Sequence, residues 1–360
     1  MINYIIKKIG YALLTLLGVV SLIFFLFTIL PGDPAQMMLG QNQSEEQLIQ
    51  MRKKYGFDQS KGKQFALYIN DLSPLSIHST QKESNFYFDA QKYRGVKLLK
   101  VGETWLSLKF PYLRESFQKN GKEVTQVIRE TLPNTIVLAV SSILLAFILG
   151  CLLGVVSALK KGSWVDQSIQ IIATLGMSIP SFFSAVIFAW LFGYVLHEYT
   201  QLNMTGSLYV LDDFGEENKL QLKNLILPSV VLGIRPLAVV SQLMRNAMLE
   251  VFGQDYIRTA KAKGLSNRQI VWKHAFKNSL NPVVTAISGW FASLLAGAVF
   301  VEYIFGWNGL GKEIVDSLNT LDLPVIMGAV LVIATMFIVI NILVDVLYAY
   351  LDPKVKSREA

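Results

Sequence analysis

Six long apolar runs constrain this chain more than any other feature of its sequence. A transmembrane α-helix needs about 20 consecutive apolar residues, because it rises ~1.5 Å per residue and the hydrocarbon core of a bilayer is ~30 Å thick. The runs cover approximately residues 9–30, 134–159, 169–196, 225–244, 283–304 and 324–351. We therefore predict an all-α membrane protein with six transmembrane helices.

Composition supports a membrane protein and argues against a nucleic-acid partner. Hydrophobic residues make up 52% of the 360 residues and charged residues 16%, whereas soluble domains carry about 25% charged residues. The net charge of +7 lies mainly in short segments beside the apolar runs, as expected of cytoplasmic loops. We expect membrane lipids, and no nucleic acid, as partners.

Few residues suggest catalysis or metal binding. Cys151 is the only cysteine and lies in an apolar run, and the three histidines have no paired spacing. The segment Gly306-Trp-Asn-Gly-Leu-Gly-Lys312 matches the first positions of a P-loop, but Glu313 follows where a working P-loop has Ser or Thr. We predict no catalytic residue, no cofactor-binding residue and no metal site in this chain.

The distribution of basic residues predicts the orientation. They precede the first run, follow the second, separate the fourth from the fifth and follow the sixth, so all lie on one side if both termini are cytoplasmic. The first run exceeds the ~7–15 residues of a signal-peptide core and is expected to remain as an anchor. The predicted parts are a transmembrane helix (1–30), an extracytoplasmic insertion (31–132), a five-helix core (133–351) with a cytoplasmic loop (245–282), and a cytoplasmic tail (352–360).

The insertion contains one clear local signal. Ser44-Glu-Glu-Gln47 has the pattern of a capping box and predicts a short helix through Lys54. Residues 73–122 are polar, with a few aromatic residues as apolar anchors. Two interpretations stay open for residues 73–122, a small ordered cap and a partly ordered loop.

The basic segment between the fourth and fifth runs is the most specific motif. Residues 254–266 read Gln-Asp-Tyr-Ile-Arg-Thr-Ala-Lys-Ala-Lys-Gly-Leu-Ser, a cationic stretch with helical character. It resembles the coupling loop of binding-protein-dependent ABC transporter permeases, where a cytoplasmic ATPase docks. Further segments, in matching order, are similar to the oligopeptide, dipeptide and nickel importer permeases. They are Leu30-Pro-Gly-Asp-Pro34, Glu130-Thr-Leu-Pro-Asn-Thr135, Leu175-Gly-Met-Ser-Ile-Pro-Ser-Phe182, Met248-Leu-Glu-Val251, His274-Ala-Phe-Lys-Asn278, Val301-Glu-Tyr-Ile-Phe-Gly-Trp307, Leu343-Val-Asp-Val-Leu-Tyr348 and Leu351-Asp-Pro353.

The resemblance implies the type I ABC importer permease fold and a bacterial cytoplasmic membrane location. It implies a heterodimer with a second, homologous permease, two cytoplasmic ATPase subunits that bind ATP and magnesium, and an extracytoplasmic substrate-binding protein, which we expect to be a lipoprotein. Oligopeptides are the expected cargo, with dipeptides or nickel and metal chelates as alternatives. From another class, an ion-coupled transporter or a membrane-embedded enzyme stays open. Ion-coupled transport would favour several buried carboxylates, and we find only Asp345 as a candidate.

The resemblance places the ATPase contacts on a run of eight residues. They are Arg258, Thr259, Ala260, Lys261, Ala262, Lys263, Gly264 and Leu265. Ala260 and Gly264 are small residues four apart, which would let a short helix sink into a groove of the ATPase, with Leu265 in a pocket and the cations at the rim. The family's motif often has Glu-Ala-Ala, whereas this chain has Arg258-Thr-Ala260, so no role of that Glu carries over. A basic amphipathic segment lying on anionic lipid is the alternative.

Two features inside the runs suggest a translocation pathway. Arg235 lies within the fourth run, where a charge costs at least about 2.5 kcal/mol unless it is paired or hydrated. It is expected to face a central cavity and contact substrate, or to pair with a structural carboxylate or reach the outer interface. Ser178, Pro180 and Ser181 in the third run predict a kink with local hydroxyl groups at a gate or cavity wall, with an ordinary tolerated kink as the alternative.

Overall fold

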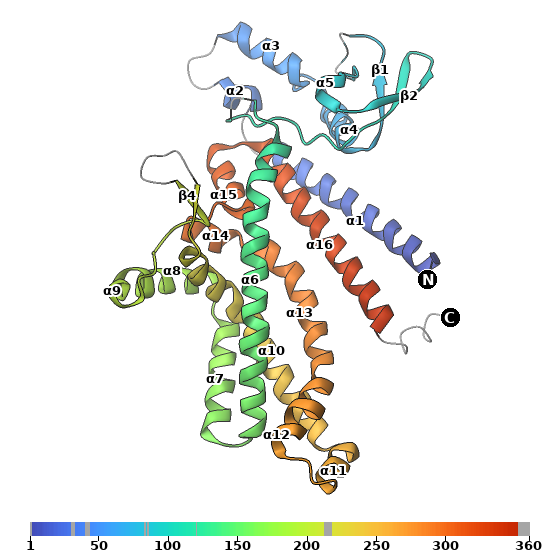
Figure 1. The fold of residues 1–360 in the computed structure, drawn as a ribbon. Helices are drawn as coiled ribbons and strands as arrows, with labels where there is room; N and C mark the ends of the chain where they lie inside the picture. The colour runs from blue at the N-terminus through green and yellow to red at the C-terminus, as the bar shows by residue number, and fades with distance from the viewer. Residues whose placement is uncertain are drawn as a thin grey trace. The chain divides into compact units, whose positions relative to one another are not determined.

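The computed structural model describes residues 2–29, 33–39, 44–82, 84, 86–119, 121–211 and 218–351 (Figure 1). The predicted cytoplasmic tail, residues 352–360, and the side chain of Asp345 lie outside this description. The chain forms two compact units, residues 1–130 with 313–335 and residues 131–312 with 336–360.

Five described helical stretches are long and apolar enough to cross a membrane, and a bent helix pair supplies a sixth. The five stretches are Lys7–Thr28 within α1 (Ile2–Ile29), α6 (Val124–Leu159), α10 (Lys223–Phe252), Asn267–Gly297, and Leu323–Val344 within α16 (Leu323–Leu351). The stretch Asn267–Gly297 consists of α12 (Asn267–Gln269), the π-helical segment η2 (Ile270–Phe276) and α13 (Lys277–Gly297). Each of the six predicted runs overlaps one of these stretches, although the fifth run, 283–304, continues past Gly297 into the separate helix α14 (Val299–Phe305). The predicted helical membrane fold is confirmed.

The third predicted span is broken rather than continuous. It consists of α7 (Trp164–Ser178) and α8 (Ser181–Trp190), the latter continued by the π-helical η1 (Leu191–Val195), and the two parts are bent by 108°. Ile179 adopts an extended conformation, with φ −80° and ψ 130°. The cause is Pro180, because proline disfavours a helical conformation at the residue before it and cannot donate a backbone hydrogen bond. The kink predicted at Pro180 is therefore present, and residues 169–196 form a sharply broken span in place of one continuous helix.

Helix α10 is central to the second unit, where it packs against α7, α8, α13 and α14 (Val299–Phe305). Glycines on α6 allow α10 to approach closely. A Cβ atom at Gly150 would lie 2.7 Å from Val240 Cγ1, and one at Gly154 would lie 2.6 Å from the carbonyl oxygen of Ser241. Small residues at such positions are typical of closely packed membrane helices. The other elements of this unit are α9 (His197–Thr200), α11 (Asp255–Ala262) and the hairpin of β4 (Tyr209–Leu211) and β5 (Asn218–Leu220), while α15 (Leu310–Thr320) begins in it.

The insertion begins with short helices. They are α2 (Pro34–Leu39), α3 (Glu45–Tyr55) and α4 (Lys61–Leu72). The predicted capping box is present, since the Ser44 hydroxyl accepts a hydrogen bond from Gln47 N at 3.3 Å and the Gln47 side chain accepts one from Ser44 N at 3.2 Å. Gly56, with φ 72°, closes α3. Helix α4 packs on α1, where the ring centroids of Phe24 and Phe65 lie 5.2 Å apart.

The rest of the insertion is an ordered cap in the described residues. Strands β1 (Leu75–Ser79), β2 (Val96–Val101) and β3 (Thr104–Leu108) form an antiparallel sheet in the order β1-β3-β2, and α5 (Ala90–Tyr93) precedes β2. Gly102 adopts φ 60° in the two-residue turn between β2 and β3, as tight hairpin turns require. This sheet is an addition to the helical architecture that we predicted, and it favours the ordered cap over the partly ordered loop.

Candidate functional site

The predicted coupling segment forms a short helix with a defined end. Helix α11 covers Asp255–Ala262, and Gly264 takes φ 74° directly after it. The next turn begins at Ser266, whose hydroxyl accepts a hydrogen bond from Gln269 N in a second capping box. Figure 1 shows α11 and α12 at the end of α10 and α13 that lies away from α14.

One face of α11 is buried against its own protein. Ile257 is fully buried and Ala260 is 6% exposed, and both belong to a hydrophobic cluster with residues of α6, α10, η2 and α13. Leu265 is half-buried against the same cluster. The expectation that Ala260 lies in a groove of the ATPase, with Leu265 in a pocket, therefore fails for Ala260, because its methyl group already packs inside this chain.

The opposite face of α11 is exposed and cationic. The exposed residues on α11 and directly after it are Asp255, Tyr256, Arg258, Thr259, Lys261, Ala262, Lys263 and Gly264. Arg258 pairs with Asp255 at 3.3 Å, but both side chains are largely in solvent, so the pair adds little stability. Asn278 Nδ2 donates a hydrogen bond to the Tyr256 hydroxyl at 3.0 Å and ties α11 to α13. The segment thus presents cations on a helix that is anchored to the helical core.

The predicted pathway residues are partly brought together. A cavity of about 70 Å³ is lined by residues of α7, α8, α10 and α13, including Ser181, Arg235 and Trp290. Ser178 and Pro180 do not line this cavity, and the Ser178 hydroxyl instead donates to the carbonyl oxygen of Thr174 at 2.9 Å.

Arg235 was expected to face a cavity or to pair with a carboxylate. It is exposed, and it forms no ion pair with any residue that the structure describes. Arg235 lines the cavity described above, and its contact with substrate stays a prediction.

Sequence reasoning missed a buried carboxylate beside the P-loop-like segment. Glu302 is fully buried and accepts backbone hydrogen bonds from Gly311 N at 2.7 Å and Lys312 N at 3.1 Å. A Cβ atom at Gly309 would lie 2.4 Å from the Glu302 carboxyl group. The glycines therefore make room for a side chain of the same protein, and the backbone N–H groups that would hold a phosphate in a P-loop already hold Glu302.

Two segments that carry the family resemblance meet near Glu302. Trp307 Nε1 donates to the carbonyl oxygen of Asn134 at 3.0 Å, and Asn134 Nδ2 donates to the carbonyl oxygen of Asn308 at 2.7 Å. Leu310 N donates to the Thr135 hydroxyl at 2.8 Å. Both segments, 130–135 and 301–307, stood out in the sequence through the family resemblance. The sequence does not show, however, that they contact each other across more than 160 residues of chain.

A second missed feature is a buried ion pair between α7 and α10. Arg245 Nε and Nη2 donate to the two Asp166 carboxylate oxygens at 2.7 and 2.8 Å. Asp166 also accepts hydrogen bonds from Gly162 N at 2.9 Å and from the Ser157 hydroxyl. Arg245 was assigned to the cytoplasmic loop at 245–282, but α10 continues to Phe252, so this arginine belongs to the core packing.

Comparison with known proteins covers the whole chain. The family described as "binding-protein-dependent transport system inner membrane component" matches residues 150–357, and the corresponding N-terminal family matches residues 1–82. The dipeptide transport system permease protein DppB of Alkalihalophilus pseudofirmus is 32% identical over 369 residues, covering 99% of this chain and 100% of the relative. The di/tripeptide transport system permease protein DppB of Pseudomonas aeruginosa is 31% identical over 377 residues, with coverage of 99% and 100%.

A solved structure of the inward-facing MetNI methionine ABC transporter is a more distant neighbour. Its TM-score is 0.48 at 16% identity, and the match covers 63% of this chain and 97% of that one. The family match over more than half of the sequence, together with relatives of full length, assigns the protein. The chain belongs to the family of binding-protein-dependent transport system inner membrane components, the permeases of ABC importers.

Proposed function

We propose that this chain is one of two permease subunits that form the path of an ATP-driven importer for short peptides. The cargo assignment rests on the names of relatives that match this chain over their full length. They are permeases for dipeptides and for di/tripeptides. These names favour dipeptides and tripeptides over the longer oligopeptides expected from the sequence. Two ATPase subunits would bind ATP and magnesium, and an extracytoplasmic binding protein would deliver the peptide. The chain itself then needs no catalytic group.

The proposed docking site for the ATPase is the exposed face of α11. Its cations, Arg258, Lys261 and Lys263, are exposed to a partner, while Ile257 and Ala260 fix the helix to the core. Movement of α11 would therefore displace α10 and α13 with it, which is what alternating access requires. This geometry supports a protein partner over lipid, because a helix lying on a bilayer has its apolar face toward the lipid, and here that face is already covered.

The orientation of the proposed importer follows from the charges. Both termini and α11 would face the cytoplasm, and the insertion would face outward. Arg235 and Ser181, which line the same cavity, would contact the carboxylate or carbonyl groups of the peptide during passage. If uptake of a labelled tripeptide stays normal in a stable Arg235→Gln variant, this role of Arg235 is wrong.

Uptake in cells tests the cargo. A strain lacking this chain should lose uptake of a labelled tripeptide, and uptake should return when the gene is restored. In the restored strain, unlabelled dipeptide should compete, a pentapeptide should compete less, and a nickel chelate should not compete. Normal tripeptide uptake without the chain, combined with lost uptake of the nickel chelate, would replace the peptide assignment by a metal-chelate importer.

Charge reversal on α11 tests the docking site. The triple variant Arg258→Glu, Lys261→Glu and Lys263→Glu should lose co-purification of the ATPase subunits and lose uptake, while the chain still inserts in the membrane. The matched control reverses Arg268 and Lys273, which are exposed cations of α12 and η2. Equal losses in both variants would show that general positive charge at the lipid surface, and not α11, is what matters.

A further inference from the structure

The cap in the insertion contains a cavity that the proposed transport mechanism does not use. Its volume is about 70 Å³, and it is lined by residues from α3, α4, α5 and the segment 112–117 and by Phe57, which follows α3. A buried water needs roughly 10–15 Å³ of such volume, so the cavity holds a few waters or one end of a small molecule. It is too small for a whole peptide.

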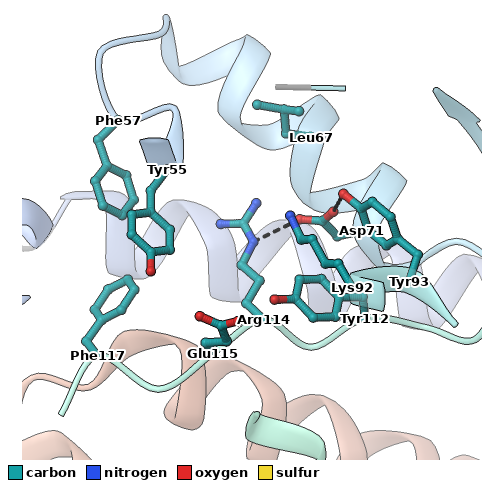
Figure 2. Close-up of a pocket in the computed structure, with 10 residues that line it drawn as sticks. All are labelled: Tyr55, Phe57, Leu67, Asp71, Lys92, Tyr93, Tyr112, Arg114, Glu115 and Phe117. Atoms are coloured by element: carbon teal, nitrogen blue, oxygen red, sulfur yellow. Dashed lines mark hydrogen bonds and ion pairs between the residues drawn. The ribbon is translucent and has the colours of Figure 1, made fainter. Parts of the chain in front are cut away.

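Arg114 stands at the centre of this cavity with most of its donors unused (Figure 2). Its Nε donates to Asp71 at 3.0 Å, and its guanidinium lies 5.1 Å from the Tyr68 ring. The two terminal nitrogens have no hydrogen-bond partner among the described residues. The backbone of Arg114 is in the left-handed region, with φ 67°, which is unfavourable for a residue other than glycine and must be held by its surroundings.

Lys92 supplies a second cation without a carboxylate partner. Its ammonium lies 4.9 Å from the ring centroids of both Tyr93 and Tyr112, and it forms no ion pair within the described part of the chain. Burial is the largest cause that lowers the pKa of Lys92. Asp71, the nearby carboxylate, is already engaged by the Tyr93 hydroxyl at 3.0 Å and by Arg114.

The other side of the cavity is aromatic. Figure 2 shows Tyr55, Phe57 and Phe117 together on the side of Arg114 that lies away from Tyr93. The ring centroids of Tyr55 and Phe57 lie 5.8 Å apart, and those of Phe57 and Phe117 lie 6.0 Å apart. The cavity thus combines unpaired N–H donors with an apolar wall.

We propose that this cavity binds a carboxylate attached to an apolar group, as found at the C-terminus of a peptide with an apolar last residue. The terminal nitrogens of Arg114 match the geometry of a carboxylate, Lys92 adds a second positive charge, and the aromatic wall takes the adjoining side chain. Glu115 lines the same cavity and opposes the binding of an anion. The carboxylate chemistry comes from the cavity alone, and the choice of a peptide as its source rests on the proposed function.

Direct binding to the full-length chain in lipid nanodiscs tests this site. The probe is the tripeptide Ala-Ala-Phe with an N-terminal fluorophore, compared with its C-terminal amide by fluorescence anisotropy. The acid should bind about tenfold more tightly than the amide, because the amide loses a hydrogen bond to a charged group. Equal binding of the two probes, or binding of neither, overturns the proposal.

Three substitutions localise the binding without disturbing the Asp71 contacts. Lys92→Gln should weaken the acid several-fold, and Glu115→Gln should strengthen it, a gain that a purely structural role would not produce. Lys100→Gln is the matched control, because Lys100 also lies over an aromatic ring, at 6.0 Å from Trp105, but does not line the cavity. An unchanged Lys92→Gln, a weakened Glu115→Gln or an equally weakened Lys100→Gln contradicts the site.

Three further results separate the C-terminal carboxylate proposal from a side-chain carboxylate site and from the transport proposal. If Ala-Glu-Ala amide binds as tightly as the free acid Ala-Ala-Phe, the cavity takes an acidic side chain and the C-terminal assignment is wrong. If cells import tripeptides but the chain binds neither probe, the cavity proposal fails and the transport proposal stands. If the chain binds the acid and the cells import no peptide, the transport proposal fails instead.

Discussion

Two buried aspartate–arginine pairs in this protein have similar exposure but different surroundings. The side chains of Asp166 and Arg245 are 4% and 21% exposed, and those of Asp71 and Arg114 are 8% and 27% exposed. Arg245 uses two nitrogens on Asp166, which also has donors from Gly162 and Ser157. Arg114 uses only Nε on Asp71 and directs its terminal nitrogens to a cavity (Figure 2).

The difference shows what each pair can do. A buried charge is stable when its hydrogen-bonding capacity is filled, and a filled pair fastens the helices that carry it. An arginine with free donors beside a cavity keeps the ability to bind an anion. The first pair is therefore structural, fastening α7 to α10, and the second is the centre of the proposed carboxylate site.

The largest expected effect on stability comes from breaking the Asp166–Arg245 pair. Asp166→Asn removes the charge that compensates Arg245, and breaking such a buried pair should lower the free energy of unfolding by about 3–5 kcal/mol. Chemical unfolding in detergent micelles measures it. Adding Arg245→Met should restore a large part of the loss, because no uncompensated charge is left. If Asp166→Asn alone lowers the free energy of unfolding by less than about 1 kcal/mol, the pair does not hold α7 and α10 together as we describe.

A carboxylate held by backbone donors should also be sensitive to crowding. Gly309→Ala places a Cβ atom 2.4 Å from the Glu302 carboxyl group, and overpacking of this kind should cost about 1–3 kcal/mol of unfolding free energy. Gly289→Ala in α13 is the control, because nothing lies within 4 Å of the position that its new methyl group would take. It should be neutral or stabilising, since alanine favours a helix over glycine. Equal effects at both glycines would contradict the tight enclosure of Glu302.

Removing one hydrogen-bond donor to Asp166 should reduce stability less than breaking the Asp166–Arg245 pair. Ser157→Ala removes the hydroxyl that donates to Asp166. The loss of one hydrogen bond to a charged group should lower the free energy of unfolding by no more than about 3 kcal/mol. The side chain of Gln170, which donates to Ser157 at 3.1 Å, can move to reduce that cost. Thermal unfolding followed by tryptophan fluorescence should show a smaller shift than for Asp166→Asn, and an equal or larger shift would break the ranking.

The smallest effect is expected at an exposed pair. Asp255 and Arg258 on α11 are 94% and 75% exposed, so Asp255→Asn should change the unfolding free energy by no more than about 0.5 kcal/mol. The same variant should bind the ATPase at least as well as the wild type, because it frees Arg258. A large loss of stability would mean that α11 is held by charge and not by Ile257 and Ala260.

Much of the helical fold could be predicted because length and hydropathy act locally. The six runs, the capping box at Ser44 and the position of α11 all follow from residues that are close in sequence. Pro180 indicates a break, but the 108° bend depends on the elements that pack on both halves. The burial of Ala260 was not predictable for the same reason, since helical spacing does not say which face meets the core.

The buried polar contacts lay beyond sequence reasoning because their partners are distant along the chain. Asp166 and Arg245 are 79 positions apart, and Asp71 and Arg114 are 43 apart. No spacing rule joins such residues. Residues 306–312 match part of a P-loop pattern, which the sequence already argued against because Glu313 follows, whereas Glu302, which fills the loop, lies outside that motif.

The most direct test of the contrast between the two pairs is to replace each arginine by lysine and to measure two properties of both variants. Lysine keeps the charge but loses the planar fork. We expect Arg245→Lys to lower stability strongly while the folded chain binds the Ala-Ala-Phe acid normally. We expect Arg114→Lys to weaken that binding about tenfold with a smaller loss of stability. If both variants lose stability and binding in parallel, the two pairs do the same work and the proposed contrast between them is wrong.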